Sequence, residues 1–267
     1  GSFWDRDDVL DTIESVLVAV TKELRGIDVT RPFPRLTWQE SMDRFGTDKP
    51  DLRFGAEIVE LSDLFGGSGF GVFRDALAGG GTIRGINVGQ QDWSRSRADS
   101  LTERAKELGA KGLVWMIVEE DRSLRSPVAK FLDDKELTGI RDALDAKPGE
   151  VLLIAADRWK LAVEVLGMLR NDLLRPSAHQ DLAFLWVIDF PLFEEDEDGT
   201  ITFSHHPFTS PASLDEMRDN PTGAISKAYD AVLNGVALGS GSVRIHDPDV
   251  QRQVFDILGI EPETAER

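Results

Sequence analysis

The sequence has 267 residues, 41% of them apolar and 29% charged, and is long enough to bury one or two sizeable hydrophobic cores. Its formal net charge of −18 opposes nonspecific binding to nucleic acid, because contacts with phosphate are made by Lys and Arg. The absence of cysteine excludes disulfide bonds and thiolate metal sites, and there is no run of about 18 apolar residues that could span a membrane. We therefore expect a soluble, cytoplasmic protein without membrane association.

Two helices are expected near the start of the chain. Apolar residues at spacings of three and four predict an amphipathic helix over residues 5–25, which Gly26 ends. Thr37 can cap a short second helix that runs through Phe45. The charged stretch Gly46–Arg53 that follows is typical of a solvated loop.

From about residue 55 the pattern changes to an alternation of strands and helices. This alternation is typical of an α/β unit with its own core. The predicted strands cover residues 82–88, 113–118 and 151–156, and the predicted helices begin at Ser94 or Ser96, cover about 134–145, and cover 159–174.

The next part of the chain contains an apolar strand and an acidic hairpin. The strand is predicted over residues 184–190, and Thr200–Ser204 is predicted as the second strand of the hairpin. The carboxylates at 194–198 lack the fixed spacing of oxygen ligands, so a solvated turn is favoured over a metal site. A final helix is predicted to begin at Asp247 and Pro248.

The stretch that ends at His246 combines small residues with one arginine. A helical pattern over residues 225–233 runs into it, and Gly239-Ser240-Gly241 is predicted as a turn where a backbone can approach a ligand. Ser242–Ile245 is predicted as a strand with Arg244 alone on one face. A single Arg beside such a turn suits bidentate capture of a carboxylate or phosphate. An exposed Arg on a half-buried strand fits the pattern as well.

Several of these stretches, taken in chain order, resemble bacterial-type aspartyl-tRNA synthetase, a class II synthetase. The resemblance covers nearly the whole chain and includes a segment of what would be that family's GAD insertion domain. The matching stretches are Phe45–Arg53 (FGTDKPDLR), Ser126–Phe131 (SPVAKF), Leu185–Pro191 (LWVIDFP), Ser204–Pro211 (SHHPFTSP) and Asn234–His246 (NGVALGSGSVRIH).

The resemblance implies an α+β fold with an interrupted core. A partial class II synthetase core, made of an antiparallel sheet with helices, is expected to enclose an α/β GAD insertion domain. The implied domains are residues 1–54 for the first core segment, 55–176 for the GAD insertion and 177–267 for the second core segment.

The family's reaction uses L-aspartate, ATP with Mg²⁺, and tRNA. Aspartate attacks the α-phosphorus of ATP, and the aspartyl group then passes to tRNA. By the resemblance, Arg244 matches the arginine that binds the side-chain carboxylate of aspartate, and His205 matches a histidine that contacts bound aspartate. His206 is a weaker substrate-binding candidate, because it points elsewhere if the segment is extended.

The nucleotide side of the site departs from the family's pattern. Asp230 matches an aspartate near the family's Mg²⁺–ATP site and is therefore a candidate metal ligand. Ala237 occupies the position of a glutamate that binds Mg²⁺ and nucleotide, and alanine offers no oxygen to a hard cation. Gly239, Ser240 and Gly241 match a nucleotide-binding triplet that is usually three glycines.

The resemblance also places important pieces outside the chain. The family's arginine that grips the α-phosphate lies in a motif normally found before residue 1, and a second, nucleotide-binding arginine lies in a motif normally found after residue 267. Pro262 is predicted to start a helix, so both ends are interpreted as cuts inside a longer protein. We expect the chain alone not to make aspartyl-adenylate, and we expect bare sheet edges that favour self-association, possible homodimerisation included. The alternative is a non-catalytic, GAD-containing binding or scaffold module.

Overall fold

The structure is a computed structural model that describes residues 4–176, 181–196 and 198–260. The chain divides into two compact units, residues 1–39 with 181–267 and residues 40–180. The second unit thus begins before residue 55, where the GAD insertion is predicted to start, and the predicted domain boundaries stay a prediction. The helix predicted to begin at Pro262 lies outside the described residues.

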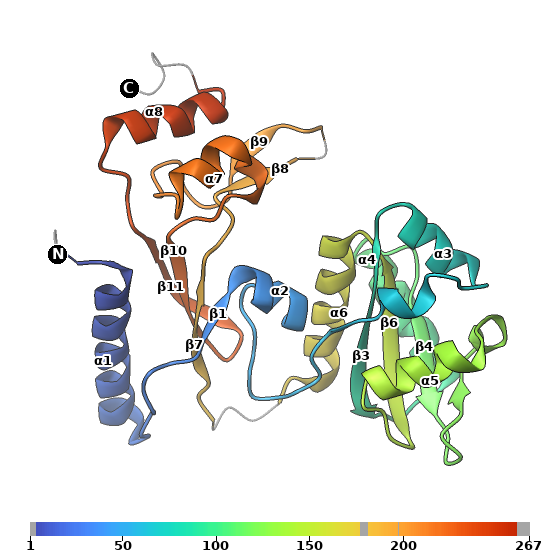
Figure 1. Ribbon diagram of the computed structural model, residues 1–267. Coiled ribbons are helices and arrows are strands. Elements are labelled where there is room, and N and C mark those ends of the chain that lie inside the picture. The colour runs from blue at the N-terminus through green and yellow to red at the C-terminus, as the bar shows by residue number, and fades with distance from the viewer. Residues whose placement is uncertain (1–3, 177–180, 197, 261–267) are drawn as a thin grey trace. The chain divides into compact units, whose positions relative to one another are not determined.

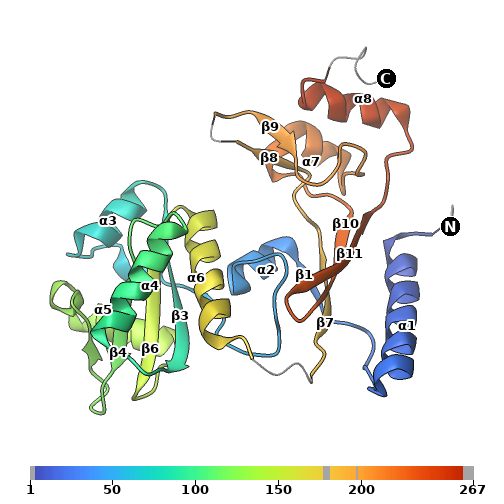
Figure 2. The ribbon, with the colours of Figure 1, turned by 180° about the vertical axis from the view of Figure 1, so that it is seen from behind.

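A four-stranded sheet forms the centre of the first unit, in the order β1-β7-β10-β11. β1 lies parallel to β7, whereas the pairs β7–β10 and β10–β11 are antiparallel. Figures 1 and 2 show α1 alongside this sheet, and the small β8–β9 hairpin near α7 and α8. The elements are α1 (Arg6–Arg25), β1 (Arg35–Thr37), β7 (Phe184–Ile188), β8 (Phe193–Glu195), β9 (Ile201–Phe203), α7 (Leu214–Asp219), β10 (Ala228–Leu233), β11 (Val236–Ser242) and α8 (Pro248–Ile257).

Both ends of α1 carry strong sequence signals. Asp5 forms a capping box with Asp8 at the first turn, and Gly26 takes a left-handed φ of 67° after the last. The helix predicted over residues 5–25 is therefore confirmed. Its buried face packs through Leu10 on the sheet residues Phe184 and Trp186.

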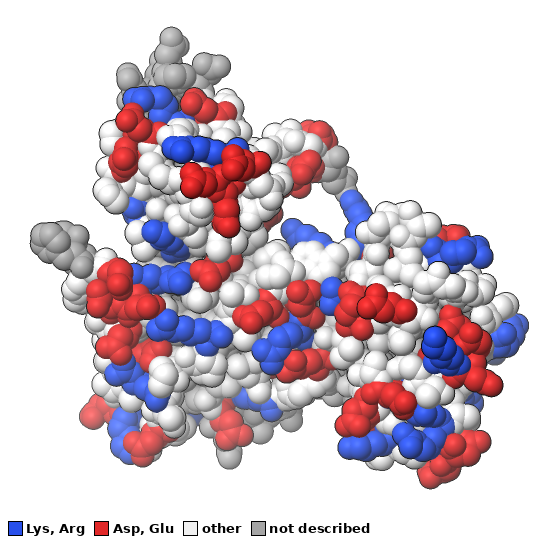
Figure 3. All heavy atoms as spheres, viewed as in Figure 1, with Lys and Arg blue, Asp and Glu red and all other residues white. Residues whose placement is uncertain are grey.

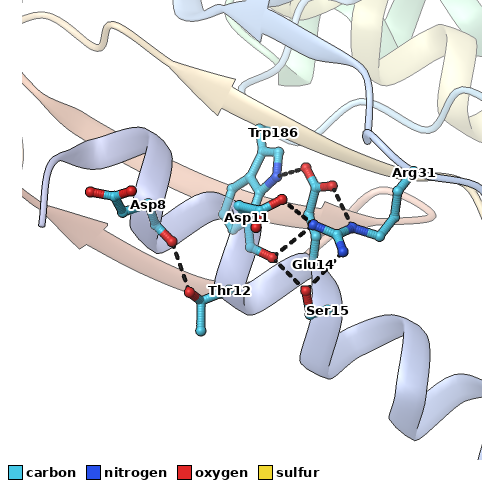
Figure 4. A network of polar contacts seen from close by, with 7 residues as sticks. All are labelled: Asp8, Asp11, Thr12, Glu14, Ser15, Arg31 and Trp186. Carbon is cyan, nitrogen blue, oxygen red and sulfur yellow. Dashed lines mark hydrogen bonds and ion pairs between the residues drawn. The ribbon is translucent and has the colours of Figure 1, made fainter.

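A buried carboxylate also ties α1 to the sheet (Figure 4). Glu14 is 2% exposed, and its two oxygens accept hydrogen bonds from Trp186 Nε1 at 2.9 Å and from Arg31 Nε at 3.2 Å. Arg31 also pairs with Asp11. Because each carboxylate oxygen of Glu14 has a donor, its burial does not leave an unpaired charge.

The prediction of a helix over residues 225–233 is wrong, because Ala228–Leu233 forms the strand β10. The predicted turn at Gly239-Ser240-Gly241 is wrong as well, since this triplet lies inside β11. The turn between the two strands is Asn234-Gly235, whose φ angles of 53° and 80° are both positive. Positive φ at both central residues is the requirement of the Asn-Gly hairpin turn.

The second unit is built on a five-stranded sheet in the order β2-β3-β6-β4-β5, and every pair in it is antiparallel. The predicted strands and helices are present, and the unit has its own hydrophobic core. Its alternating elements thus make an α+β unit rather than one with a parallel sheet. They are α2 (Trp38–Phe45), which begins in the first unit, β2 (Val59–Glu60), α3 (Gly71–Ala78), β3 (Thr82–Gln90), α4 (Arg95–Glu107), β4 (Val114–Val118), β5 (Leu124–Arg125), α5 (Asp134–Ala143), β6 (Glu150–Asp157) and α6 (Trp159–Leu174). Short 3₁₀ turns cover Ser62–Phe65, Ala129–Phe131 and, in the first unit, Pro221–Gly223.

The loop of residues 46–56 lies against α6 and is held there by Arg170. The backbones meet closely, because a Cβ added at Gly167 would lie 2.4 Å from the Phe45 carbonyl oxygen. Arg170 is 0% exposed and donates to the carbonyls of Asp51, Phe54, Gly55 and Ala56 at 2.6–3.2 Å. Its guanidinium carbon also lies 4.1 Å from the centre of the Phe54 ring. The loop is thus fixed by one buried cation.

Candidate functional site

Asp230 lies at the centre of the first unit's sheet. Its neighbours across the strands are Val187 on β7 and Ser240 on β11. The side chain is buried, at 3% exposure, and no described residue donates a hydrogen bond to its Oδ1. A buried carboxylate oxygen without a donor is costly, and such groups are rare in folded proteins. Asp230 is therefore a centre of unsatisfied negative charge.

His205 is the nearest basic group to that carboxylate. Its Nε2 lies 4.0 Å from Asp230 Oδ1, which is too long for a hydrogen bond. The imidazole packs edge-on against the ring of Phe190, with 4.5 Å between centroids. Its side chain is about one-third exposed, so a ligand can reach it from solvent. The structure thus brings together two of the predicted residues, His205 and Asp230.

Arg244 follows the end of β11 and joins the site through its backbone. The predicted strand over Ser242–Ile245 is reduced to an isolated bridge, in which Arg244 pairs with Thr209. The Arg244 side chain is exposed, and no carboxylate of the described residues lies within ion-pair distance of it. The segment of residues 204–211 therefore links the candidates, since it carries His205 and pairs with Arg244.

His206 is not brought to Asp230. Its ring lies 4.8 Å from that of Phe208, and its Nδ1 accepts a hydrogen bond from the Phe208 backbone N–H at 3.3 Å. These contacts hold the imidazole in the local turn. His206 therefore stays a prediction with no support from the geometry.

The two faces of β11 separate the predicted nucleotide-binding residues. A β-bulge shifts the register between Ala231 and Val232, so that Ala237 pairs with Val232 and Ser240 with Asp230. Because paired residues share a face, Ala237 and Ser240 lie on the Asp230 face of the sheet, away from α1. Gly239 and Gly241 lie on the α1 face.

Gly241 is required by a neighbouring side chain. A Cβ at this position would lie 2.6 Å from the ring of Tyr229, the residue that faces it on β10. Packing within the sheet therefore explains this glycine without a ligand. A cavity of about 310 Å³ adjoins Leu238 and Gly239 on the same α1 side and is lined mainly by apolar residues of α1, β7 and β10. The triplet is not a phosphate-cradling turn in this structure.

The chain's residues do not fit a magnesium site here. Ala237 carries no oxygen on its side chain, and Asp230 is a single carboxylate. No group of three or more His, Asp or Glu that could hold a metal ion occurs among the described residues. Mg²⁺ is usually held by one or two carboxylates together with waters and substrate phosphate, and only the single, buried carboxylate of Asp230 is offered here. We therefore assign no metal-dependent step to this cluster.

One contributor escaped prediction although its sequence signal was visible. Phe190 supplies the ring on which His205 packs. Its neighbour Asp189 takes a left-handed φ of 56° and pairs with Arg6 of α1 at 2.6 Å, so it ties the end of β7 to α1. An Asp-Phe-Pro sequence directly after an apolar strand marks the point where the strand turns, which is where side chains of a site are often placed.

The comparisons with known proteins agree with this fold. The family described as class II tRNA synthetases (D, K and N) matches residues 1–267. The chain therefore belongs to the class II tRNA synthetases.

Its relatives narrow the family further. The chain is 45% identical over 275 residues to an aspartate–tRNA(Asp/Asn) ligase of Natranaerobius thermophilus, covering 100% of this chain and 46% of that protein. It is 46% identical over 271 residues to an aspartate–tRNA ligase of Agathobacter rectalis, covering 99% of this chain and 45% of that protein. The predicted resemblance to bacterial-type aspartyl-tRNA synthetase is confirmed. The chain spans about half the length of the curated relatives it matches.

Proposed function

We propose that this chain is the part of an aspartate–tRNA ligase that recognises L-aspartate, and that it lacks most of the ATP site. The observation that carries the proposal is the state of Arg244. This exposed guanidinium has no acidic partner among the described residues, and it pairs through its backbone with the segment that bears His205. An arginine whose backbone is held by a bridge and whose side chain has no acidic partner is available for a ligand's carboxylate.

Arg244 and His205 divide the recognition of aspartate in this proposal. The planar guanidinium of Arg244 forks onto the side-chain carboxylate, and the uncharged amide of asparagine fits the same site poorly. His205 contacts the bound amino acid from the segment next to β11. The buried carboxylate of Asp230, 4.0 Å from His205 Nε2, supplies negative charge close to the ligand's ammonium group.

The proposed lack of an ATP site rests on residue types and on the family resemblance. Position 237 carries Ala where the family has a Mg²⁺-binding glutamate, and position 240 carries Ser where it has Gly. The resemblance places the arginine that grips the α-phosphate and a second, nucleotide-binding arginine outside residues 1–267. We therefore expect the isolated chain to make no aspartyl-adenylate.

Calorimetric titration tests the proposal. Aspartate is titrated first and ATP with Mg²⁺ second, into the wild type and into Arg244→Leu. The expected result is aspartate binding that Arg244→Leu weakens at least about tenfold, with no ATP binding. Arg252→Leu is the matched control, because Arg252 is an exposed arginine of α8 that already pairs with Asp249 at 2.9 Å. Equal aspartate affinities in the wild type and Arg244→Leu would overturn the assignment.

A second candidate function is a non-catalytic binding or scaffold module. Ala237 favours it, because this residue lies on the Asp230 face, where the family's glutamate would supply an oxygen. Ala237→Glu in a full-length context separates the two functions through the rate of ATP–pyrophosphate exchange. A large gain in rate supports a disabled ligase, and no gain supports the scaffold.

The remaining proposals concern tRNA, a second copy of the chain and the cellular location. tRNA would be bound mainly by other parts of a full-length ligase. This chain has a net charge of −18, and acidic groups are interspersed with basic ones on the face shown in Figure 3.

A homodimer is favoured by β11, which lies at the edge of the sheet of described strands. Its side chains Val236 and Leu238 are 56% and 47% exposed. We propose a cytoplasmic location because the family acts in translation. No helix of the described chain is long and apolar enough to cross a membrane.

A further inference from the structure

The helix α1 has two apolar faces, and only one of them packs on the sheet of its unit. Leu10 belongs to the packed face. The other face is a stripe of apolar side chains at helical spacings of three and four. Its members Ile13, Val16, Val20 and Leu24 are 39%, 52%, 47% and 75% exposed. A continuous exposed stripe of this kind marks an interaction surface, whereas single exposed apolar residues do not.

A cavity lies beside the first half of this stripe, between α1 and β11. Its volume is about 310 Å³, and its lining is mainly apolar. Val9 and Ile13 line it from α1, and Leu238 lines it from β11. Gly239 lines it as well, and a Cβ added there would have nothing within 4 Å. The cavity therefore has room for a large apolar side chain from outside.

The same helix carries a side chain that suits this cavity but cannot reach it. Leu24 is the most exposed large apolar side chain of the described residues. At about 1.5 Å per residue, it lies about 22 Å along the helix from Val9. A second copy whose α1 runs antiparallel brings leucine and cavity together twice, about one two-fold axis. Val9 then faces Leu24 of the second copy, Ile13 faces Val20, and Val16 lies next to the axis.

The charges at the two ends of α1 fit the same arrangement. The first turn carries Asp7 and Asp8, and the last turn carries Lys22 and Arg25. In an antiparallel pair, the acidic first turn of each copy approaches the basic last turn of the other, and the helix dipoles oppose one another. A parallel pair would bring like charges together. The helix is therefore complementary to a second, antiparallel copy of itself.

We propose that two copies of this chain associate through α1, with the helices antiparallel and Leu24 of each copy in the cavity of the other. The inference rests on the homodimer of the proposed function and gives that homodimer a specific interface. It does not rest on the recognition of aspartate, because Arg244 and His205 take no part in the contact.

Analytical ultracentrifugation of the 267-residue chain tests the interface. Between about 1 μM and about 200 μM, we expect a reversible monomer–dimer equilibrium with a Kd on the order of 10 μM. Leu24→Asp brings a charge to the apolar cavity and should weaken the dimer at least about tenfold. Val72→Asp is the matched control, because Val72 of α3 is 54% exposed and lies outside the interface, and it should change the Kd by less than about twofold. Gly239→Val fills the cavity from its own chain and should weaken the dimer as well.

Cross-linking tests the antiparallel geometry, because the chain has no cysteine of its own. Val16→Cys places one thiol beside the two-fold axis, so oxidation should join two copies through a disulfide bond. Val236→Cys, at the exposed start of β11, should not form one. The opposite result, with Val236→Cys cross-linked and Val16→Cys not, would move the contact to the edge of the sheet and overturn the proposal.

Two further outcomes overturn the interface. One is a chain that stays monomeric at about 200 μM, which would leave the cavity to another part of a full-length ligase. The other is a Leu24→Asp variant that dimerises as the wild type does. Calorimetric titration with aspartate separates these failures from failure of the proposed function. Leu24→Asp should bind aspartate like the wild type, whereas a wild type that dimerises but does not bind aspartate would contradict only the recognition of aspartate.

Discussion

Arg170 of α6 and Asp230 of β10 are both charged, and both are buried, at 0% and 3% exposure. Arg170 gives its hydrogen bonds to four carbonyls of the loop that crosses it, although its Nη1 has no partner among the described residues. Asp230 has Oδ1 unsatisfied and a histidine 4.0 Å away. Burial alone therefore does not mark a functional charge. A charge whose partners are supplied by the chain organises the fold, whereas a charge left without them is available to a ligand.

The pKa of Arg170 is consistent with its structural role. Burial lowers the pKa of Arg170 to about 10, and the nearby carboxylates of Asp51 and Glu57 oppose that change. Arg170 therefore stays charged at neutral pH, so its contacts with the loop persist under physiological conditions. The carbonyls and carboxylates that offset the cost of burying this cation all belong to the unit of residues 40–180.

The largest expected effect follows from removing the cation of the loop. Arg170→Met leaves four backbone carbonyls without their donor, and we expect the free energy of unfolding to fall by about 3 kcal/mol or more. Urea unfolding followed by circular dichroism measures this change. Arg104→Met is the control, because the ion pairs that Arg104 of α4 makes with Glu107 and Asp172 lie at the surface, and its loss should cost much less than the loss of Arg170. Similar losses in the two variants would remove the distinction between an organising charge and a surface charge.

A smaller loss of stability is expected from changing Asp51, which pairs with Arg53 at 2.5 Å in the same loop. Burial alone raises the pKa of Asp51, but hydrogen bonds from Arg53 outweigh it and hold the pKa below its ordinary value near 3.8. This carboxylate therefore stabilises the fold above that value, and the stability is lost as pH falls through the folded pKa.

Asp51→Asn should cost about 2 kcal/mol at neutral pH and flatten the acid side of the stability curve. Unfolding free energies of wild type and variant, measured from about pH 6 to about pH 2, give the comparison. The pairing has no energetic role if the two curves stay parallel.

The smallest change in the free energy of unfolding is expected at Asp230, and there it is an increase. Asp230→Asn removes an unpaired buried charge, so we expect the protein to become more stable by about 1 kcal/mol while aspartate binding weakens. Thermal unfolding and calorimetry measure the two changes. Asp189→Asn is the matched control, because this carboxylate is paired with Arg6 and should gain no stability when neutralised. A loss of stability at Asp230 equal to that at Asp51 would show that both carboxylates serve the fold.

The helices were the most predictable part of the molecule because their ends are encoded locally. The helix of residues 159–174 is found with the predicted bounds, and Ser94 is the N-cap of α4 as one of the two predicted alternatives. Both depend on apolar spacing and on side chains within one turn of the chain.

The strand β10 was mispredicted because both of its faces are covered. Its neighbours are β7 and β11, α1 packs on one face, and Asp230 and Val232 are buried on the other, so no alternation of polar and apolar residues remains. A short apolar run of this kind fits a helix and a strand equally well. The Asn234-Gly235 pair was the signal that decides between them, since it predicts a tight hairpin.

The candidate site was predictable in its residues but not in its geometry. His205, Asp230 and Arg244 were named from the family resemblance, and the structure brings the first two to within 4.0 Å. The separation of Ala237 from Gly239 and Gly241 onto opposite faces depends on register, and register depends on long-range pairing. The role of Arg170 could not be predicted from local sequence, because its hydrogen-bond acceptors are backbone carbonyls more than a hundred residues away.

The β-bulge next to Leu238 sets the frame in which β11 presents its side chains. With an uninterrupted ladder, position 237 would pair with Leu233 and face α1, and Leu238 would take its place on the Asp230 side. The single extra residue, Leu238, keeps the residues on the turn side of β11 in step with the β10 residues that they face. Whatever residue occupies position 237, its place on the Asp230 face depends on this pairing as much as on the side chain. Deleting Leu238 would remove the bulge and leave Ala237 paired with Val232, so position 237 would stay on the Asp230 face.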